Sequence, residues 1–173
     1  MKKIVCSILL AAALMGATSV QAQKYALIDM EYILKNIPNY EVANEQLSTL
    51  SKRWQAEVDK VQQEAQALYK AYQADLATLA PDAKSKRETE IVTKEQEAQD
   101  LKRKYFGTDG ELFKRRESLL KPIQDDIYEA VKDIATAKEY VLIVDRASAT
   151  SVIYASPTID ISNEVLAKLG FSK

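Results

Sequence analysis

The middle of the chain carries apolar residues in an eleven-residue repeat, and this pattern constrains the fold more than any other feature. From Leu47, the residues at offsets 0, 3 and 7 of each repeat are apolar up to Ala80. The repeat returns between residues 98 and 138, where its exceptions are Asp109, Arg116 and Lys138. A period of eleven is typical of long helices that pack as a nearly straight or slightly right-handed coil. The sequence therefore predicts helix over roughly residues 40–138.

Pro81 divides this helical region into two halves. Proline lacks an amide hydrogen and clashes with the preceding turn, so the first helix should end before it, near Leu79. Proline is well tolerated at the first position of a helix, so the second helix should begin there. A short connection joins antiparallel neighbours. We therefore expect a coiled-coil hairpin with its tip near residue 81, and an arm about 60 Å long at 1.5 Å per residue.

Five residues are candidates for a joint in this arm. Counting equal distances from the tip places Trp54 opposite residue 108, close to Gly107 and Gly110. Glycine inside a helix costs about 1 kcal/mol relative to alanine, so two glycines so close together need a reason. They either make room for the indole ring or form a flexible joint. Pro38 and Pro122 also fall at one level and predict a kink or hinge where the arm leaves the rest of the chain.

Three short apolar runs flank the helical region and have the length and composition of strands. They are residues 25–30, 140–145 and 151–155. A three-stranded sheet with open edges is marginal alone and prone to pair with other chains, so the pattern indicates an oligomer. The side chains expected to build this sheet are Leu27, Ile28, Val141, Ile143, Val152 and Ile153. A final short helix is expected between Asp160, as its N-cap, and Gly170. The predicted fold class is α+β and predominantly helical.

Residues 1–22 have the features of a cleaved signal peptide. A basic start precedes an apolar run from Ile4 to Gly16, and Val20-Gln21-Ala22 provides small residues three and one before the expected cleavage. The run is too short to span a membrane, which takes about 20 residues. Cys6, the single cysteine, lies inside it, so neither a lipoprotein nor a disulfide is expected.

The composition argues against most catalytic sites. The chain has no histidine, which excludes His-containing triads and His-bearing metal sites. One cysteine excludes Cys-cluster metal sites. Carboxylate pairs remain, namely Asp125 with Asp126 and Asp29 with Asp145. Adjacent helical residues do not face the same way, and carboxylates that end strands commonly cap or form turns. We therefore predict no enzyme activity and no cofactor or metal.

The arm has more aromatic residues than a narrow apolar seam requires. Tyr69 and Tyr72 lie on the seam, whereas Phe106 and Phe113 lie beside it. Exposed aromatic side chains next to a cavity would suit weak contacts with unfolded apolar chains. These four residues are the candidate contacts, and ordinary packing is the alternative for each.

The order of these segments resembles the Skp (OmpH-like) family of periplasmic chaperones. The resemblance covers essentially the whole chain after residue 22. It rests on Lys24–Met30, Gly107–Arg116, Tyr140–Asp145, Val152–Tyr154 and Asp160–Ser162. It implies a homotrimer whose strands form one small body and whose arms enclose a cavity. The family captures unfolded outer-membrane proteins in the periplasm without ATP. Residues 23–38 and 122–173 would belong to the body and 39–121 to the arm, with no nucleic acid as partner.

The charge of this chain departs from the family. Members are often strongly basic, and that charge is tied to acidic clients and to lipopolysaccharide. This chain has a formal net charge of −1, with 24 Lys and Arg against 25 Asp and Glu, and loses Lys2 and Lys3 with the signal peptide. Lipopolysaccharide binding is therefore doubtful. The alternative function is a coiled-coil structural adaptor of an envelope or efflux assembly, although such proteins usually carry Gly-rich β domains and a membrane anchor.

Overall fold

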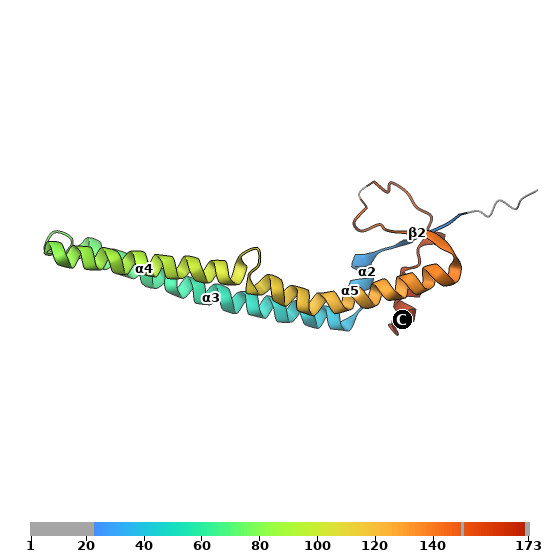
Figure 1. Ribbon diagram of the computed structural model, residues 1–173, viewed down its shortest axis with the longest axis horizontal. Coiled ribbons are helices and arrows are strands. Elements are labelled where there is room, and N and C mark those ends of the chain that lie inside the picture. The colour runs from blue at the N-terminus through green and yellow to red at the C-terminus, as the bar shows by residue number, and fades with distance from the viewer. Residues whose placement is uncertain (1–22, 150, 172–173) are drawn as a thin grey trace, which may run out of the picture.

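The protein consists of a long helical arm with a small body at one end (Figure 1). The computed structural model describes residues 23–149 and 151–171. The expected signal peptide, including Cys6, lies outside the described residues. Within the described ranges, no helix combines the length and apolar character needed to cross a membrane.

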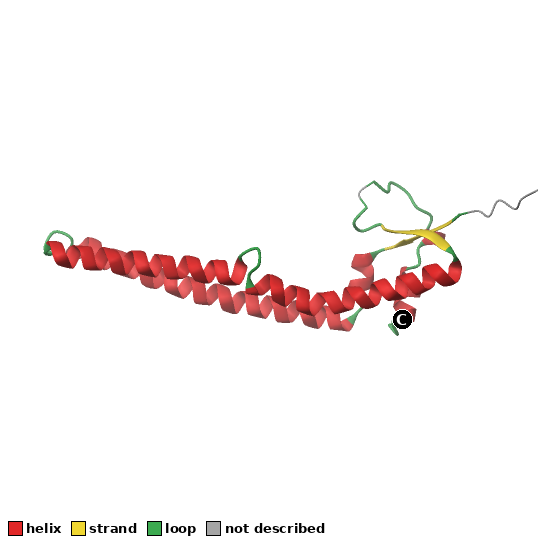
Figure 2. Ribbon diagram, in the orientation of Figure 1, coloured by secondary structure: helices red, strands yellow, loops and turns green. Residues whose placement is uncertain are grey.

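Three helices form the arm as an antiparallel hairpin (Figure 2). Helix α3 spans Pro38–Asp75 and runs outward, and α4 (Pro81–Phe106) and α5 (Glu111–Lys138) run back along it. Helix α4 begins at Pro81 as predicted, but α3 ends before the expected Leu79. Thr78 closes that end, because its backbone N–H and its hydroxyl both donate to the Asp75 carbonyl, at 2.9 and 3.0 Å. Residues 76–80 form the tip.

The predicted apolar repeat is the seam along which these helices pack. Its buried positions are Leu47, Val58, Val61, Ala65, Ala98, Tyr105, Ile127 and Ile134. The exceptions to the repeat, at residues 109, 116 and 138, are all exposed. Near the tip the repeat continues but burial does not, since Tyr69 is 47% and Leu76 41% exposed. The seam is therefore confirmed, although its outer end is less well covered than the rest.

The return half of the hairpin is not one helix, contrary to the prediction. It is interrupted at residues 107–110, where Gly107 is the C-cap of α4 and Gly110 the N-cap of α5. The Gly107 N–H donates to the Arg103 carbonyl at 2.9 Å, and the Gly110 N–H donates to the Gly107 carbonyl at 2.9 Å. Their backbone hydrogen bonds thus close a tight loop in place of the next helical turn.

The body is built on two parallel strands, β1 (Lys24–Ile28) and β2 (Tyr140–Asp145), in which Ala26 lies opposite Ile143. The first strand ends earlier than predicted because Asp29 caps a short helix, α2 (Met30–Lys35), that the sequence analysis missed. The Asp29 carboxylate accepts the N–H of Tyr32 at 2.8 Å, a typical N-cap bond.

The third predicted strand is not formed, so the expectation for Val152 and Ile153 was wrong for the single chain. The described residues of this segment form a turn and irregular chain, and Ile153 is 99% exposed. A strand needs a partner for its backbone groups, and none is offered here. The segment at Asp160 and Ile161 pairs with the free edge of β1 instead. The Leu27 carbonyl accepts the Ile161 N–H there at 2.9 Å.

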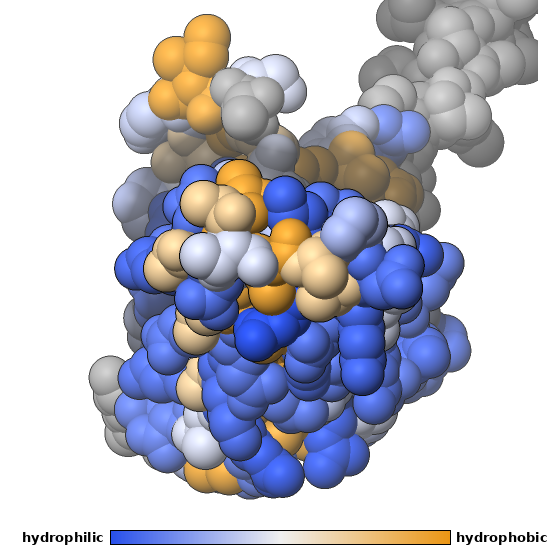
Figure 3. Space-filling model, turned by 90° about the vertical axis from the view of Figure 1, so that its left-hand side faces the viewer, coloured by the Kyte–Doolittle hydropathy of each residue, from blue (hydrophilic) through white to orange (hydrophobic). Residues whose placement is uncertain are grey.

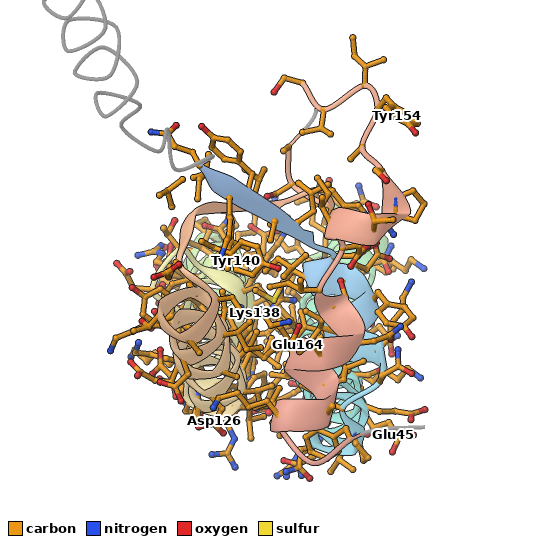
Figure 4. The ribbon with its side chains drawn as sticks, turned by 90° about the vertical axis from the view of Figure 1, so that its right-hand side faces the viewer. Glu45, Asp126, Lys138, Tyr140, Tyr154 and Glu164 are labelled. Carbon is orange, nitrogen blue, oxygen red and sulfur yellow. The ribbon has the colours of Figure 1, made fainter. Side chains whose placement is uncertain are left out.

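A compact core joins β1, α2, α5 and α6 (Ser162–Lys168), which follows the short 3₁₀ helix Pro157–Ile159. Ile33, Ile127 and Val165 are fully buried in it. Two ion pairs tie α6 to α5, Lys138–Glu164 at 2.6 Å and Lys168–Asp133 at 2.9 Å. Figure 4 shows Lys138 and Glu164 pointing toward one another.

The ends of α6 differ slightly from the prediction. Its N-cap is Ile161, and the Asp160 carboxylate accepts from the backbone and hydroxyl of Ser162 instead. At the other end Gly170 has φ +86°, as a C′ residue needs. The Phe171 N–H donates to the Leu166 carbonyl at 2.8 Å, which completes a Schellman motif.

Candidate functional site

Apolar side chains stay exposed along the whole arm, and they form the candidate contact surface. Figure 3, which looks onto the tip, shows apolar surface there among hydrophilic residues. Scattered exposed apolar residues are common, but here they recur from the root of the arm to its tip. The large ones are Val42, Tyr69, Leu76, Val92 and Phe113.

The four predicted contact aromatics fall into two pairs. Tyr69 and Phe113 are each 47% exposed and are available to another molecule. Tyr72 is partly buried, and its hydroxyl donates to the Glu88 carboxylate at 2.5 Å across the hairpin. That hydrogen bond raises the pKa of Tyr72. Phe106 is also partly buried, with its ring edge-on to Tyr105 at 6.4 Å.

A groove lies beside Tyr69, between α3 and α4, with a volume of about 460 Å³. Ala65 and Ala98 are both buried here, and such small side chains leave a hollow between the helices. The rest of the lining is an aromatic ring and polar side chains. These are Gln62, Gln66, Tyr69, Glu95 and Gln99. The groove thus offers an apolar floor with amide groups at its rim.

A second groove follows one face of α4 alone. It has a volume of about 800 Å³ and includes the exposed Val92. Its other lining residues are Thr93, Gln96, Glu97, Asp100, Leu101 and Lys104. Both grooves are shallow and mixed in polarity, which suits several weak contacts better than one tight site.

Three polar contacts cross from α3 to α4 and fix how the two helices align. Besides the Tyr72–Glu88 bond, Lys94 pairs with Glu64 at 3.2 Å, and the Tyr105 hydroxyl donates to Glu57 at 2.9 Å. The Glu57 hydrogen bond raises the pKa of Tyr105. These contacts lie at three successive levels, so together they stabilise the observed register of α4 on α3.

The predicted packing of Trp54 against the two glycines is not what the structure shows. The Trp54 ring stacks on Tyr105, in the last turn of α4, with centroids 5.0 Å apart and planes 5° from parallel. A Cβ atom on Gly107 would collide with the Arg103 carbonyl oxygen, and one on Gly110 would lie 2.8 Å from the Gly107 nitrogen. The glycines are needed because the loop backbone folds onto itself.

The two prolines of the predicted joint lie at the root of the arm. Pro38 is the first residue of α3, and Pro122 lies inside α5, which continues on both sides of it. Ile37 is buried in the body core and Ile123 packs against that core. Both prolines therefore adjoin the point where the arm enters the body.

The body also exposes apolar side chains, around β2 and the loop that follows it. Val141 is 60% and Leu142 52% exposed, whereas Ile143 is partly buried and Leu27 and Ile28 are buried. A groove of about 480 Å³ runs between α5 and β2, beside Tyr128. The loop beyond β2 carries the exposed Tyr154, which Figure 4 shows standing away from the body.

Sequence reasoning did not single out Tyr128, Val92 or Tyr154. Tyr128 and Val92 lie off the apolar seam, so their exposure was readable in principle from the same repeat that located the buried residues. Tyr154 lies in the third apolar run, but a strand prediction does not say which of its faces stays exposed.

Comparison with known proteins places the chain in a family. Residues 24–169 match the family described as Outer membrane protein (OmpH-like). The chain belongs to this family. A Chaperone protein Skp from Yersinia enterocolitica is 30% identical over 168 residues, covering 96% of this chain and 98% of that protein. Another, from Pectobacterium atrosepticum, is 28% identical over 176 residues with the same coverage.

A solved structure shares the fold of this OmpH-like chain. It is the crystal structure of a putative outer membrane chaperone (OmpH-like) from Caulobacter crescentus CB15, with a TM-score of 0.66 and 18% identity. The likeness covers 89% of this chain and 88% of that one, so it includes both the arm and the body.

The charged surface of this OmpH-like protein is a mixture of signs. Basic residues 102–104 and 114–116 are exposed on either side of the 107–110 loop. Two of them are paired within their own helix, Arg103 with Asp100 at 3.4 Å and Lys114 with Glu111 at 3.3 Å. Exposed pairs of this kind contribute little to stability, and they keep the arm hydrated along its flanks.

Proposed function

We propose that the protein is an ATP-independent periplasmic chaperone that holds unfolded outer-membrane proteins between its helical arms and prevents their aggregation. The supporting observation is the 30% identity to a Chaperone protein Skp over nearly the whole of both chains. The exported location follows from the signal sequence expected over residues 1–22. Holding a client requires no catalytic step and no cofactor.

The proposed clients suit the arm chemically. Strands of outer-membrane barrels alternate apolar and polar residues, and before insertion their unpaired edges aggregate in water. Weak contacts distributed along an arm retain many such sequences without selecting one. Tyr69 and Phe113, being exposed, are the main proposed contacts, and Tyr72 and Phe106, being partly exposed, contribute less.

We propose that the working form is a homotrimer. A two-stranded sheet with an open edge is at best marginal, and β2 presents apolar residues beside a groove that another chain would cover. The segment around Ile153, which is irregular in the single chain, would gain a strand partner from a neighbouring copy. In this proposal residues 23–38 and 122–173 form the shared body, and residues 39–121 form each arm.

One experiment tests assembly and client binding together. The chain beginning at residue 23 is measured by native mass spectrometry with and without a urea-denatured outer-membrane barrel protein. The expected species are three chains alone, and three chains with one client. Light scattering of the diluted client should fall when the protein is in excess.

Variants refine this test. Replacing Tyr69 and Phe113 by alanine should weaken protection while leaving the mass of the assembly unchanged. The matched control replaces Tyr32, an exposed tyrosine of the body, by alanine. A trimer that does not reduce scattering at several-fold excess contradicts the chaperone function. Stable stoichiometric binding to an inner-membrane transporter would support the adaptor alternative instead.

A further inference from the structure

The loop at residues 107–110 contains about one helical turn of chain that does not lengthen the arm. Four residues correspond to slightly more than one turn at 3.6 residues per turn. In Figure 1 the loop rises from the arm and returns beside the point where it left, so that α5 continues the line of α4. Helix α3 passes the same level without interruption.

The apolar seam runs through this loop as though the loop were helix. Tyr105 is buried on the α4 side, and Leu112, seven residues later, is half-buried on the α5 side. The same spacing separates Ile91 from Ala98 and Ala98 from Tyr105. Adding or removing about one whole turn hardly changes the direction of the side chains that follow. Helix α5 therefore presents its apolar face to α3 whether or not residues 107–110 are helical.

The outer end of α3 offers a place for α4 to move into. The apolar repeat of α3 extends to Tyr69 and Leu76, which remain 47% and 41% exposed in this register. Leu76 already has helical backbone angles, φ −51° and ψ −37°, so α3 is able to lengthen at this end. A displacement of α4 by one turn toward the tip would bring new partners to both side chains.

The same displacement changes the residue that faces Trp54. In the observed register Trp54 stacks on Tyr105. If α4 moved outward by one turn, Tyr105 would leave this level and residues 107–110, wound into helix, would take its place. Asp109, four residues after Tyr105 and on the same helix face, would then lie at the level of the indole. Equal counting from the tip also pairs Trp54 with residue 108.

We propose that residues 107–110 are a stored helical turn that gives the arm two registers. In the short register the loop is extruded, as observed. In the long register α4 and α5 form one helix, and α4 lies one turn nearer the tip. One-turn shifts between packed helices are an established form of two-state switching. Four residues at 1.5 Å each move the outer part of α4 by about 6 Å.

Polar contacts hold the short register and would be exchanged in the long one. They are the bonds of Glu57 to Tyr105, Glu64 to Lys94 and Tyr72 to Glu88. The proposal concerns the arm alone and does not depend on what the arm binds. A failure of client binding would therefore leave it intact, and its own failure would leave the chaperone function intact.

Distances between spin labels distinguish the two registers. The chain from residue 23 has no cysteine of its own, so cysteines are introduced in pairs and labelled. Asp126 on α5 with Lys86 on α4 reports the shift, because the long register increases this distance by about 6 Å. Asp126 with Gln73 on α3 is the control pair and stays constant. Labelled chains are diluted with unlabelled protein so that only distances within one chain are measured.

Three variants test the proposal by their effect on the populations of the two registers. G107A/G110A disfavours the extruded loop, in which both Cβ atoms would be crowded, and favours continuous helix. T108A is the matched control, because Thr108 is an exposed residue of the same loop. Deletion of residues 107–110 removes the stored turn altogether.

The expected wild-type distribution for the 126–86 pair is a short distance with a minor component about 6 Å longer. The long component should dominate in G107A/G110A, remain minor in T108A and disappear in the deletion variant. Wild-type and deletion distributions that coincide overturn the proposal, even if G107A/G110A does not fold. A folded G107A/G110A with unchanged distances, or with both pairs lengthened equally, also overturns it.

Discussion

The body and the arm are stabilised in different ways. In the body, side chains from four elements meet in one core, and Ile33, Ile127 and Val165 lose all contact with solvent. In the arm, each helix buries one stripe, and polar contacts between α3 and α4 fix the alignment. A core of the first kind has one arrangement, whereas a periodic seam tolerates several. Under the two-register proposal, the body therefore keeps one arrangement while the arm moves.

The largest expected effect on stability comes from truncating a buried side chain of the body core. Ile127→Ala should cost about 2–5 kcal/mol, because a fully buried side chain leaves a cavity that its neighbours fill only partly. Denaturant unfolding at fixed protein concentration measures it. Val58→Ala on the arm seam is the comparison and should cost less. Equal losses of unfolding free energy in the two variants would show that the arm seam is packed as tightly as the body core.

The second effect concerns the exposed apolar surface of the body. Leu142→Asp and Ile153→Asp should each shift the native mass from three chains toward one, because they place a charge where the proposed neighbour packs. Helical content should remain near wild type, since both side chains are exposed in the single chain. Val92→Asp on the arm is the control and should leave the mass unchanged. An unchanged trimer in both body variants would contradict the proposed interface.

The third prediction distinguishes the effect of the Tyr105 hydrogen bond on the register from the effect of its ring on packing. Tyr105→Phe keeps the ring that stacks on Trp54 but removes the hydroxyl that donates to Glu57. We expect only a small loss of stability, together with a larger share of the long register in the 126–86 distance distribution. Stability that falls without any change in the distance distribution would show that this hydrogen bond does not select the register.

The fourth effect is a pH dependence of the two ion pairs that tie α6 to α5 in the body. The hydrogen bond from Lys168 lowers the pKa of Asp133 below its usual 3.8. Its contribution is therefore complete above about pH 4 and is lost as the pH falls through the folded-state value. The Glu164 pair raises the pKa of Lys138, so that contribution is lost only above about pH 10.5.

Stability measured from pH 7 to pH 3 checks this dependence. Asp133→Asn should reduce the acid-side loss, whereas Asp126→Asn, an exposed carboxylate on the same helix, should not. Identical acid profiles for wild type and Asp133→Asn would show that this pair does not anchor α6.

The smallest effect lies between arm and body, at Glu139. This residue has φ 60°, in the left-handed region that glycine adopts without strain, and it alone separates α5 from β2. Glu139→Gly should change stability by less than about 1 kcal/mol, because relief of strain is offset by loss of the Lys24 ion pair. Thermal unfolding measures the sum. Glu139→Gln, which removes the charge but keeps the side chain, isolates the ion pair.

Periodic features were predictable from sequence, and features that depend on a partner were not. The apolar repeat located the seam, and Pro81 located the start of α4, because both act within a few residues of chain. Gly107 and Gly110 were named as a candidate joint, but the interruption of the helix there was not predicted, because the repeat continues in phase through it. The segment containing Ile153 has the composition of a strand, but composition supplies no neighbouring strand. Helix α2 was missed because Asp29 suggested only a strand end.

The candidate contact surface was predictable only in part. Four aromatics were named from their position relative to the seam, but Tyr72 and Phe106 proved partly buried by neighbours on the opposite helix or the adjacent residue. Such contacts depend on the register of the hairpin. The spacing of apolar residues in the sequence defines this register only to within several residues.

Helix α5 belongs to both regions, and this has a mechanical consequence. Its first turns lie along α3, its later residues Ile127 and Ile134 are embedded in the body core, and a single residue then leads into β2. The arm is thus clamped at its root like a cantilever beam. A sideways load near the tip displaces the outer half most, while the bending stress is greatest where the helices enter the body. The tip of the arm is therefore able to move while the body core stays intact.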